Sequence, residues 1–247
     1  MINFLKKYML GKFRKARLYI SPCFLNEFYI RRAIESINKN YKFSGSLLDI
    51  GCGSKPYIDL FKDVKEYKGI DFKSYSINKD SSIYRPDYFF GKEYNKDLKL
   101  SFNKETFDNV VSFQVLEHHP KPEKLVSEMV RVTRTGGYIL LTAPFLGGIH
   151  EEPNDYQRLT RYGLRELFKM YKCKILVVEE QGSVFSTISM LLNEFLSSFA
   201  SKNKWRYFIS VLIYAPFILF SYISLLLDKV FKSKKIFLNY LILAKKE

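Results

Sequence analysis

The chain has 247 residues, enough to bury a substantial core without disulfides or metals. Its composition, 47% hydrophobic and 26% charged, excludes a disordered or fibrous protein. The three cysteines are scattered and form no Cys-x-x-Cys pair. A disulfide scaffold and a cysteine-rich zinc site are therefore excluded, and a reducing cytoplasm is favoured.

The net charge of +15 is concentrated at the two ends of the chain. Residues 1–40 and residues 201–247 each carry nine basic and two acidic residues, whereas the centre is nearly neutral. A neutral body with two basic ends favours docking on an anionic surface, either lipid headgroups or nucleic acid. The alternative is a lysine-rich composition without a particular partner.

Apolar positions at helical spacing predict an amphipathic helix over residues 24–37. From residue 46 short buried strands alternate with helices. We expect strands at 47–50, 67–71, 107–113, 138–143, 174–178 and 237–244, and helices at 122–132 and 160–171. Gly136 and Gly137 are expected to turn the first of these helices into the next strand. This alternation predicts a mostly parallel sheet covered on both faces.

The last third of the chain departs from this pattern. Residues 208–227 carry no charge, and on length alone they could cross a bilayer. Residues 184–200, which precede them, are also largely apolar.

One loop carries a recognisable binding pattern. Asp49, Gly51 and Gly53 follow a predicted strand, and glycines there let a ligand approach the backbone closely. Asp71 ends the next strand, where a carboxylate can accept both hydroxyls of a ribose. The pattern predicts a nucleotide-type cofactor at the carboxyl ends of the strands. Pro56 stands where the NAD fingerprint has its third glycine, which disfavours a NAD-dependent oxidoreductase.

Five ordered segments carry a family resemblance: LLDIGCGSKPY, YKGID, LSFNKETFDNVVSFQVLEHHP, RVTRTGGYILLTAPF and HEEPNDYQRLTRYGLRELF. Together they resemble class I S-adenosylmethionine-dependent methyltransferases, in particular the subgroup with Asp-x-Gly-Cys-Gly and Leu-Glu-His signatures that is often encoded among bacterial cell-surface glycan enzymes. The resemblance covers about residues 45–182 and the final strand.

The resemblance implies an α/β Rossmann-like fold. We expect a seven-stranded, mostly parallel sheet with helices on both faces, an antiparallel last strand and an apolar helical insertion before that strand. The expected parts are a basic helical region at 1–40, a methyltransferase domain at 41–182 and 236–247, and the insertion at 183–235.

The resemblance also implies S-adenosyl-L-methionine as cofactor and assigns residues to it. Asp49, Gly51 and Gly53 would hold its methionine end, Asp71 its ribose and Asp97 its adenine, and Phe113 and Gln114 would line the sulfonium side. The neighbouring Cys52 and Phe72 also count as cofactor-binding. Lys55 departs from the family pattern, which has a third glycine there.

Methyl transfer to an alcohol requires alignment of the reactants and removal of the hydroxyl proton, for which an imidazole is suited. His150, in the glycine-rich loop after the fifth strand, is the preferred acceptor-side base, and its alternative is a structural histidine that pins this loop. His119 is a further catalytic candidate at the pocket edge. Glu117 and His118 are expected to be structural. No ligand spacing supports a metal site, so none is expected.

The final strand must return to the sheet, which argues against a single membrane crossing. A helical hairpin would translocate the basic loop at 201–206, against the positive-inside tendency. We therefore expect a peripheral or monotopic protein on the cytoplasmic side, with the insertion in the membrane interface and basic residues after 228 on anionic headgroups. A buried helical subdomain and a homodimer interface are the alternatives.

These expectations combine into one function, O-methylation of a lipid-linked glycan, a lipid or another amphiphilic acceptor at the membrane. An RNA methyltransferase is the first alternative. It is disfavoured by the apolar insertion and by the lack of a recognisable RNA-reading module. A non-catalytic, membrane-associated scaffold that binds the cofactor is the second.

Overall fold

The computed structural model describes residues 24–72, 85–90, 99–198 and 204–247, and the side chains of 198 and 204–215 are outside this description. The chain divides into two compact units. The sheet unit comprises Arg31–Phe145, Ile149–Glu180 and Asn239–Glu247. The helical unit comprises Met1–Ile30, Leu146–Gly148 and Gln181–Leu238.

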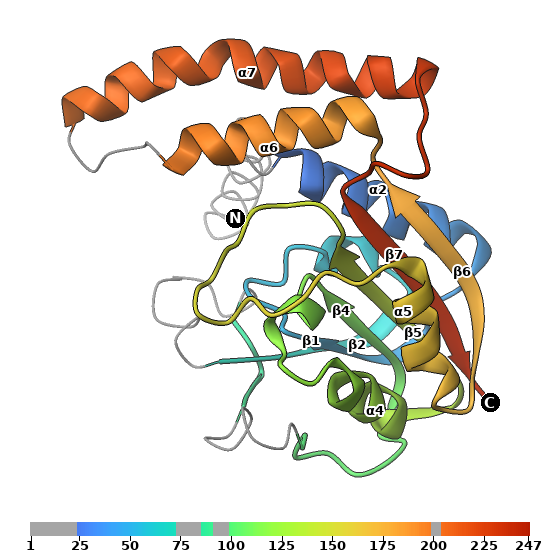
Figure 1. Ribbon diagram of the computed structural model, residues 1–247. Coiled ribbons are helices and arrows are strands. Elements are labelled where there is room, and N and C mark those ends of the chain that lie inside the picture. The colour runs from blue at the N-terminus through green and yellow to red at the C-terminus, as the bar shows by residue number, and fades with distance from the viewer. Residues whose placement is uncertain (1–23, 73–84, 91–98, 199–203) are drawn as a thin grey trace, which may run out of the picture. The chain divides into compact units, whose positions relative to one another are not determined.

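A seven-stranded sheet forms the centre of the sheet unit (Figure 1). Its strands are β1 Gly45–Ile50, β2 Val64–Asp71, β3 Tyr88–Phe89, β4 Phe107–Phe113, β5 Thr133–Pro144, β6 Cys173–Gln181 and β7 Asn239–Lys246. They follow the order β3-β2-β1-β4-β5-β7-β6. The neighbours from β3 to β5 pair in parallel, and β7 pairs antiparallel with β5. The predicted Rossmann-like fold with an antiparallel last strand is confirmed.

The central strands form because their apolar residues run consecutively, as expected for strands buried on both faces. Leu47 and Leu48 of β1 and Val110 and Val111 of β4 are fully buried. In the parallel register Asp49 of β1 lies opposite Gly69 of β2 and opposite Val111 of β4. The carboxyl ends of β1, β2 and β4 therefore meet at one edge of the sheet, where a ligand binds in open α/β sheets.

The helices of the sheet unit follow the predicted periodicity. Helix α4 (Pro122–Val132) begins with proline in its first turn, a position that needs no backbone donor. Helix α5 (Arg161–Lys169) is capped by Thr160, whose hydroxyl accepts a hydrogen bond from the Gly163 amide at 3.3 Å. Helix α2 (Phe24–Asn40) begins in the helical unit and continues into the sheet unit.

The sequence-based expectations are met for most elements, but one detail was wrong. Gly136 and Gly137 lie inside β5 and do not form a turn between helix and strand, because α4 already ends at Val132. Gly136 has φ +84°, and the β4–β5 register shifts beside this segment. The two glycines therefore form a bulge-like irregularity inside the strand. The short β3 was not predicted, because two residues give no periodic signal.

Helices α6 (Val184–Ser198) and α7 (Lys204–Val230) form an antiparallel hairpin in the helical unit (Figure 1). Polar side chains line its interface. The hydroxyls of Ser189 and Ser221 lie 2.8 Å apart, and the Asn193 amide donates to Ser221 at 2.9 Å. Asp228 of α7 accepts hydrogen bonds from the Phe185 amide and the Ser186 hydroxyl at the start of α6. The interface is therefore held by buried hydrogen bonds.

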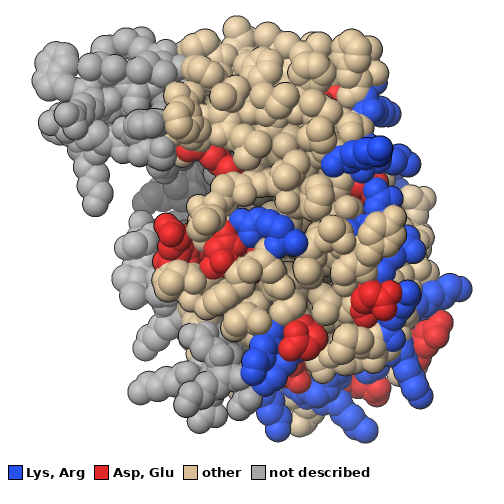
Figure 2. All heavy atoms as spheres, viewed as in Figure 1, with Lys and Arg blue, Asp and Glu red and all other residues tan. Residues whose placement is uncertain are grey.

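The outer surface of the hairpin is apolar. Along α7 the exposed residues Leu219, Ile223, Leu226 and Val230 recur at the spacing of one helix face. Exposed apolar side chains of α6 are Ile188, Leu191, Leu192 and Phe195. Figure 2 shows the described part of the hairpin with few charged side chains. Within the ranges searched, which are those described, no helix combines the length and apolar character needed to cross a membrane.

Candidate functional site

The loop after β1 folds tightly over β2. The amides of Gly51 and Cys52 both donate to the carbonyl of Ile70, at 2.9 and 3.2 Å. Gly51 has φ +72°, and a Cβ there would overlap the Val115 side chain. Gly53 has φ +49°, but a Cβ there would meet only open space. Gly51 is therefore required by packing, whereas Gly53 presents bare backbone to a space that a ligand can fill.

Asp71 at the end of β2 holds this loop in place. Its Oδ2 accepts a hydrogen bond from the Gly53 amide at 2.5 Å, and its Oδ1 accepts one from the Phe72 amide at 2.6 Å. The side chain is only 5% exposed. The Phe72 ring lies beside Phe90, with centroids 5.0 Å apart. The structure therefore brings the predicted ribose-binding carboxylate into contact with the glycine loop.

Asp49 is a buried carboxylate whose hydrogen bonding is incomplete. Its Oδ2 accepts a hydrogen bond from the Tyr67 hydroxyl at 2.5 Å. Its buried Oδ1 has no hydrogen-bond partner among the residues that the structure describes. Burial raises the pKa of Asp49 to about 7, although the Tyr67 hydrogen bond opposes this rise. An unpartnered acceptor of this kind suits a cationic ligand group.

Lys55 keeps the glycine-like conformation of the position it occupies, with φ +52°. Its ammonium group is buried and lies 2.7 Å from Asp87, which also accepts a hydrogen bond from the Gly69 amide. The departure from the family pattern therefore leaves the left-handed backbone of the loop intact.

Of the remaining predicted cofactor residues, Phe113, Gln114 and Cys52 lie in the described part of the structure and Asp97 does not. Phe113 is buried against Tyr57, with ring centroids 4.8 Å apart. Gln114 has φ +55° and donates its side-chain amide to Thr142 at 3.1 Å. Cys52 is buried, which raises the pKa of its thiol. Asp97 lies outside the described residues.

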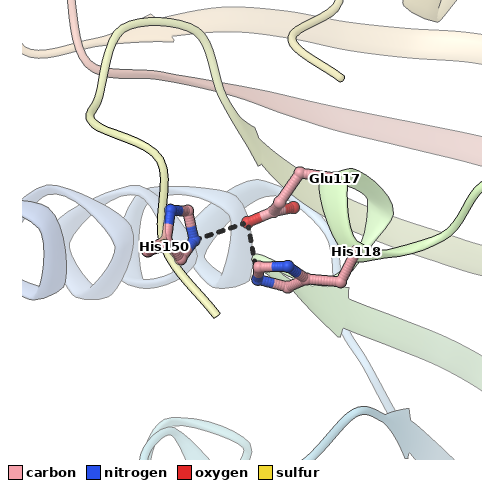
Figure 3. Close-up of side chains that lie close together, drawn as sticks. All are labelled: Glu117, His118 and His150. Carbon is pink, nitrogen blue, oxygen red and sulfur yellow. Dashed lines mark ion pairs between the residues drawn. The ribbon is translucent and has the colours of Figure 1, made fainter. Parts of the chain in front are cut away.

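A second group of side chains gathers after β4 and β5. Glu117 and His118 lie in the 3₁₀ turn η4 (Leu116–His118), and His150 follows β5 (Figure 3). Glu117 Oε1 lies 3.7 Å from His118 Nε2 and 3.8 Å from His150 Nε2. The two imidazole rings meet edge to face, with centroids 4.8 Å apart. Both ring Nε2 atoms therefore face the same carboxylate.

Glu117 is the buried member of this cluster. Its side chain is 1% exposed, against 18% for His118 and 46% for His150. Neither carboxylate oxygen has a hydrogen-bond partner within the described ranges. Burial raises the pKa of Glu117 to about 8. Glu117 and His118 are predicted from the sequence to be structural, and the structure places Glu117 close to His150, a proximity that no sequence pattern indicates.

The segment 154–158 fixes the cluster by main-chain contacts. The His118 Nδ1 lies 2.7 Å from the Asn154 carbonyl, and the Tyr156 amide donates to the Glu117 carbonyl at 2.9 Å. Gln157 donates its side-chain amide to the carbonyls of Leu116 and His119. The turn that carries Glu117 and His118 is thereby held at several points.

Asp155 orients His150 from the opposite side. Its Oδ2 accepts a hydrogen bond from the His150 amide at 3.1 Å and lies 3.4 Å from His150 Nδ1. Hydrogen bonds from Arg158 lower the pKa of Asp155 to about 2. His150 therefore faces Asp155 through Nδ1 and Glu117 through Nε2. His119 is buried, and its Nδ1 contacts the main chain of Lys121, not the cluster.

The sheet order, the glycine loop and the strand-terminal Asp71 together form the nucleotide-binding edge of a Rossmann-like sheet. Residues 48–141 match a family model described as a methyltransferase domain. The open space over Gly53 and the unpartnered Asp49 Oδ1 fit the cofactor, whose methionine end carries positive charge. The cofactor of this domain is S-adenosylmethionine.

Two curated relatives have names that describe lipid methyltransferases. A phosphatidylethanolamine N-methyltransferase of Cereibacter sphaeroides is 31% identical over 121 residues, which are 47% of this chain and 57% of that protein. A sterol 24-C-methyltransferase of Candida albicans is 29% identical over 156 residues, 57% of this chain and 38% of that protein. The chain thus matches less than two thirds of the length of either relative.

Solved structures share the fold at low sequence identity. The (4+2)-cyclase SpnF is 16% identical with a TM-score of 0.56, and the match covers 87% of this chain and 81% of that one. Phosphoethanolamine N-methyltransferase 2 of Haemonchus contortus, solved with S-adenosylmethionine, is 17% identical with a TM-score of 0.52, covering 87% and 52%. A cyclase and a methyltransferase thus share this architecture, so the reaction depends on the site.

Proposed function

We propose that the protein transfers a methyl group from S-adenosylmethionine to an oxygen of an amphiphilic acceptor, such as a lipid or lipid-linked glycan. It would work at the cytoplasmic face of an anionic membrane as a peripheral or monotopic protein. The observation that carries this proposal is the hairpin of α6 and α7, in which several polar residues are buried between the helices while many of the described apolar residues are exposed.

This distribution is the reverse of a water-soluble helix pair. In a hairpin surrounded by water, apolar residues fill the interface and polar residues face outward. Here Ser221, Ser224 and Asp228 of α7 are at most 6% exposed, whereas Leu226 is 62% exposed. Small polar residues between helices with apolar residues outside are typical of helices in lipid. Lipid is therefore the proposed occupant of the outer face.

Lysines after the hairpin support an anionic surface. Lys229, Lys232, Lys234 and Lys235 are all exposed and close together in sequence. Each basic residue near an anionic membrane contributes about 1 kcal/mol. The names of the curated relatives, which include a phospholipid and a sterol methyltransferase, agree with an amphiphilic acceptor.

The glycine loop and the carboxylates beside it would bind the cofactor. The carboxylates of Asp49 and Asp71 would hold the methionine end and the ribose, and the Gly53 backbone would approach the ligand. The bound cofactor supplies a methyl group on a sulfonium, whose positive charge disappears on transfer. Asp49 would favour the cationic reactant, and its buried environment keeps water from competing for it.

The acceptor half belongs to the cluster of Glu117, His118 and His150. This cluster would hold the acceptor hydroxyl and take up its proton at His150 Nε2, and the cofactor would supply the methyl group. His150, the most exposed member, is the predicted acceptor-side group. The further catalytic assignment to His119 stays a prediction.

Membrane docking is tested by co-sedimentation with phosphatidylcholine vesicles with and without 30% phosphatidylglycerol. We expect binding only to the anionic vesicles, weakened at high salt, and lost in Leu226→Glu. Met170→Glu is the matched control, since Met170 is equally exposed in the sheet unit. The membrane proposal would be contradicted if the wild-type protein sedimented with neither type of vesicle. It would also be contradicted if the protein were a dimer that Leu226→Glu dissociates.

The acceptor class is tested with S-adenosylmethionine labelled in its methyl group. A bacterial total lipid extract and total RNA are offered in separate reactions. Label in the organic phase that hydriodic acid releases as methyl iodide supports an O-methyl product on a lipid, because N- and C-bound methyl groups withstand this treatment. Label in RNA would overturn the proposed acceptor, and label in neither, with the cofactor bound, would favour a scaffold.

A further inference from the structure

We propose that Glu117, His118 and His150 together bind a divalent metal ion of the zinc type, with further coordination positions open to the acceptor. The metal-binding claim stands on the geometry of these three side chains. Only the role toward an acceptor oxygen rests on the proposed function.

The ligand atoms converge at nearly the spacing that a metal requires. No two of the three are farther apart than 4.8 Å, and the carboxylate oxygen lies 3.7 and 3.8 Å from the two nitrogens. Zinc bonds of about 2.1 Å at tetrahedral angles place ligand atoms about 3.4 Å apart. The two carboxylate–nitrogen distances therefore have to shorten by a few tenths of an ångström, and the widest pair, at up to 4.8 Å, by about 1.4 Å, which a rotation of the half-exposed His150 side chain can supply. Two imidazoles and one carboxylate form a recurring catalytic zinc ligand set.

The groups that contact Nδ1 of His118 and His150 leave Nε2 of each ring available to bind a metal. The carbonyl of Asn154 can only accept a hydrogen bond, so His118 Nδ1, 2.7 Å away, carries the proton. The Asp155 carboxylate faces His150 Nδ1 at 3.4 Å. In both rings the lone pair then lies on Nε2, the atom that faces Glu117. Metal-binding histidines are held in this way by a carbonyl or carboxylate on the other nitrogen.

Glu117 supplies the observation that points to a bound cation. Its two oxygens are buried and lack hydrogen-bond donors among the described residues, while both facing nitrogens present lone pairs. With Glu117 ionised, three electron-rich atoms point at one another, and a cation between them removes the repulsion. Arg158, whose charge acts on Glu117, is engaged by Asp155 through two hydrogen bonds. A metal ion satisfies all three atoms at once.

An ion at this position would have an exposed side, because His150 is only half buried. Water or an acceptor oxygen could complete its coordination. A metal lowers the pKa of a bound hydroxyl, so the proton could pass to solvent water with no protein base. In that case His150 acts as a ligand and not as the proton acceptor.

The experiment measures metal binding to the full-length protein without substrate. Protein purified with chelator is titrated with Zn²⁺ by calorimetry and with Co²⁺ by visible absorption. We expect one equivalent of each ion and d–d bands typical of nitrogen and oxygen ligands. Mg²⁺ should not bind, because it prefers oxygen ligands.

Variants assign the ion to the cluster. Both His150→Ala and Glu117→Gln should abolish the Co²⁺ spectrum, and Asp155→Asn should weaken binding by about 10- to 100-fold. Glu152→Gln, an exposed acid in the same loop, is the control and should bind as wild type does. His150 is half exposed, so loss of binding in His150→Ala with an unchanged melting temperature cannot be attributed to misfolding.

Two results would overturn the metal site. One is a folded protein that binds neither Zn²⁺ nor Co²⁺ at millimolar concentration. The other is unchanged binding in His150→Ala. If the protein binds metal but methylates no lipid, the metal site stands and the proposed acceptor is refuted. If the protein binds no metal, methylates lipid and loses this activity in His150→Ala, then His150 is the base and the metal site is refuted.

Discussion

Replacing Asp49 by asparagine should stabilise the free protein at alkaline pH and abolish cofactor binding. Burial raises the pKa of this carboxyl from 3.8 to about 7. The folded state therefore holds a proton that the unfolded state releases between these values, so the free energy of unfolding falls as pH rises through this window. Between pH 5 and pH 8 this one group lowers the stability by about 2.5 kcal/mol. Asparagine removes that dependence.

Urea unfolding at pH 5 and pH 8 measures the effect. The stability of Asp49→Asn relative to wild type should increase by about 2.5 kcal/mol from the lower to the higher pH, whatever the asparagine itself costs. Asp63→Asn, an exposed aspartate, is the control and should show no such change. Calorimetry with S-adenosylmethionine should show no binding to Asp49→Asn. Equal relative stability at both pH values would refute the argument that Asp49 is a buried, partly protonated carboxyl.

Other substitutions test the same site. Tyr67→Phe removes the donor to Asp49 and should weaken cofactor binding about tenfold, since a hydrogen bond to a charged group contributes about 1.5–3 kcal/mol; calorimetry giving wild-type affinity would count against this. Gly51→Ala should destabilise the fold by several kcal/mol, because its Cβ meets Val115 at a positive φ, and a melting temperature within a few degrees of wild type would contradict this. Gly53→Ala should cost only about 1–2 kcal/mol in urea unfolding yet lose cofactor binding, because its Cβ enters the open space. Retained binding would show that the cofactor lies elsewhere.

The positions of most strands along the chain and the cofactor loop could be predicted because their signals are local. A run of apolar residues that ends at Gly51 marks a buried strand and a tight turn, and both depend only on neighbouring residues. Asp71 could be placed at the same sheet edge, because parallel strands end together. Residues 208–227 were visibly apolar, but composition does not tell which side of a helix faces its partner.

Tertiary structure alone decided the three features that carry the functional argument. The β1–β2 register sets Tyr67 against Asp49 and leaves the other carboxylate oxygen without a partner. The crossover through α4 and β5 brings His150 to Glu117 and His118, which the sequence separates. Packing of α6 on α7 turns Ser189 and Ser221 inward and leaves Leu191 and Leu226 exposed. Each depends on contacts between distant segments, whose geometry is set by the whole fold and not by any local pattern.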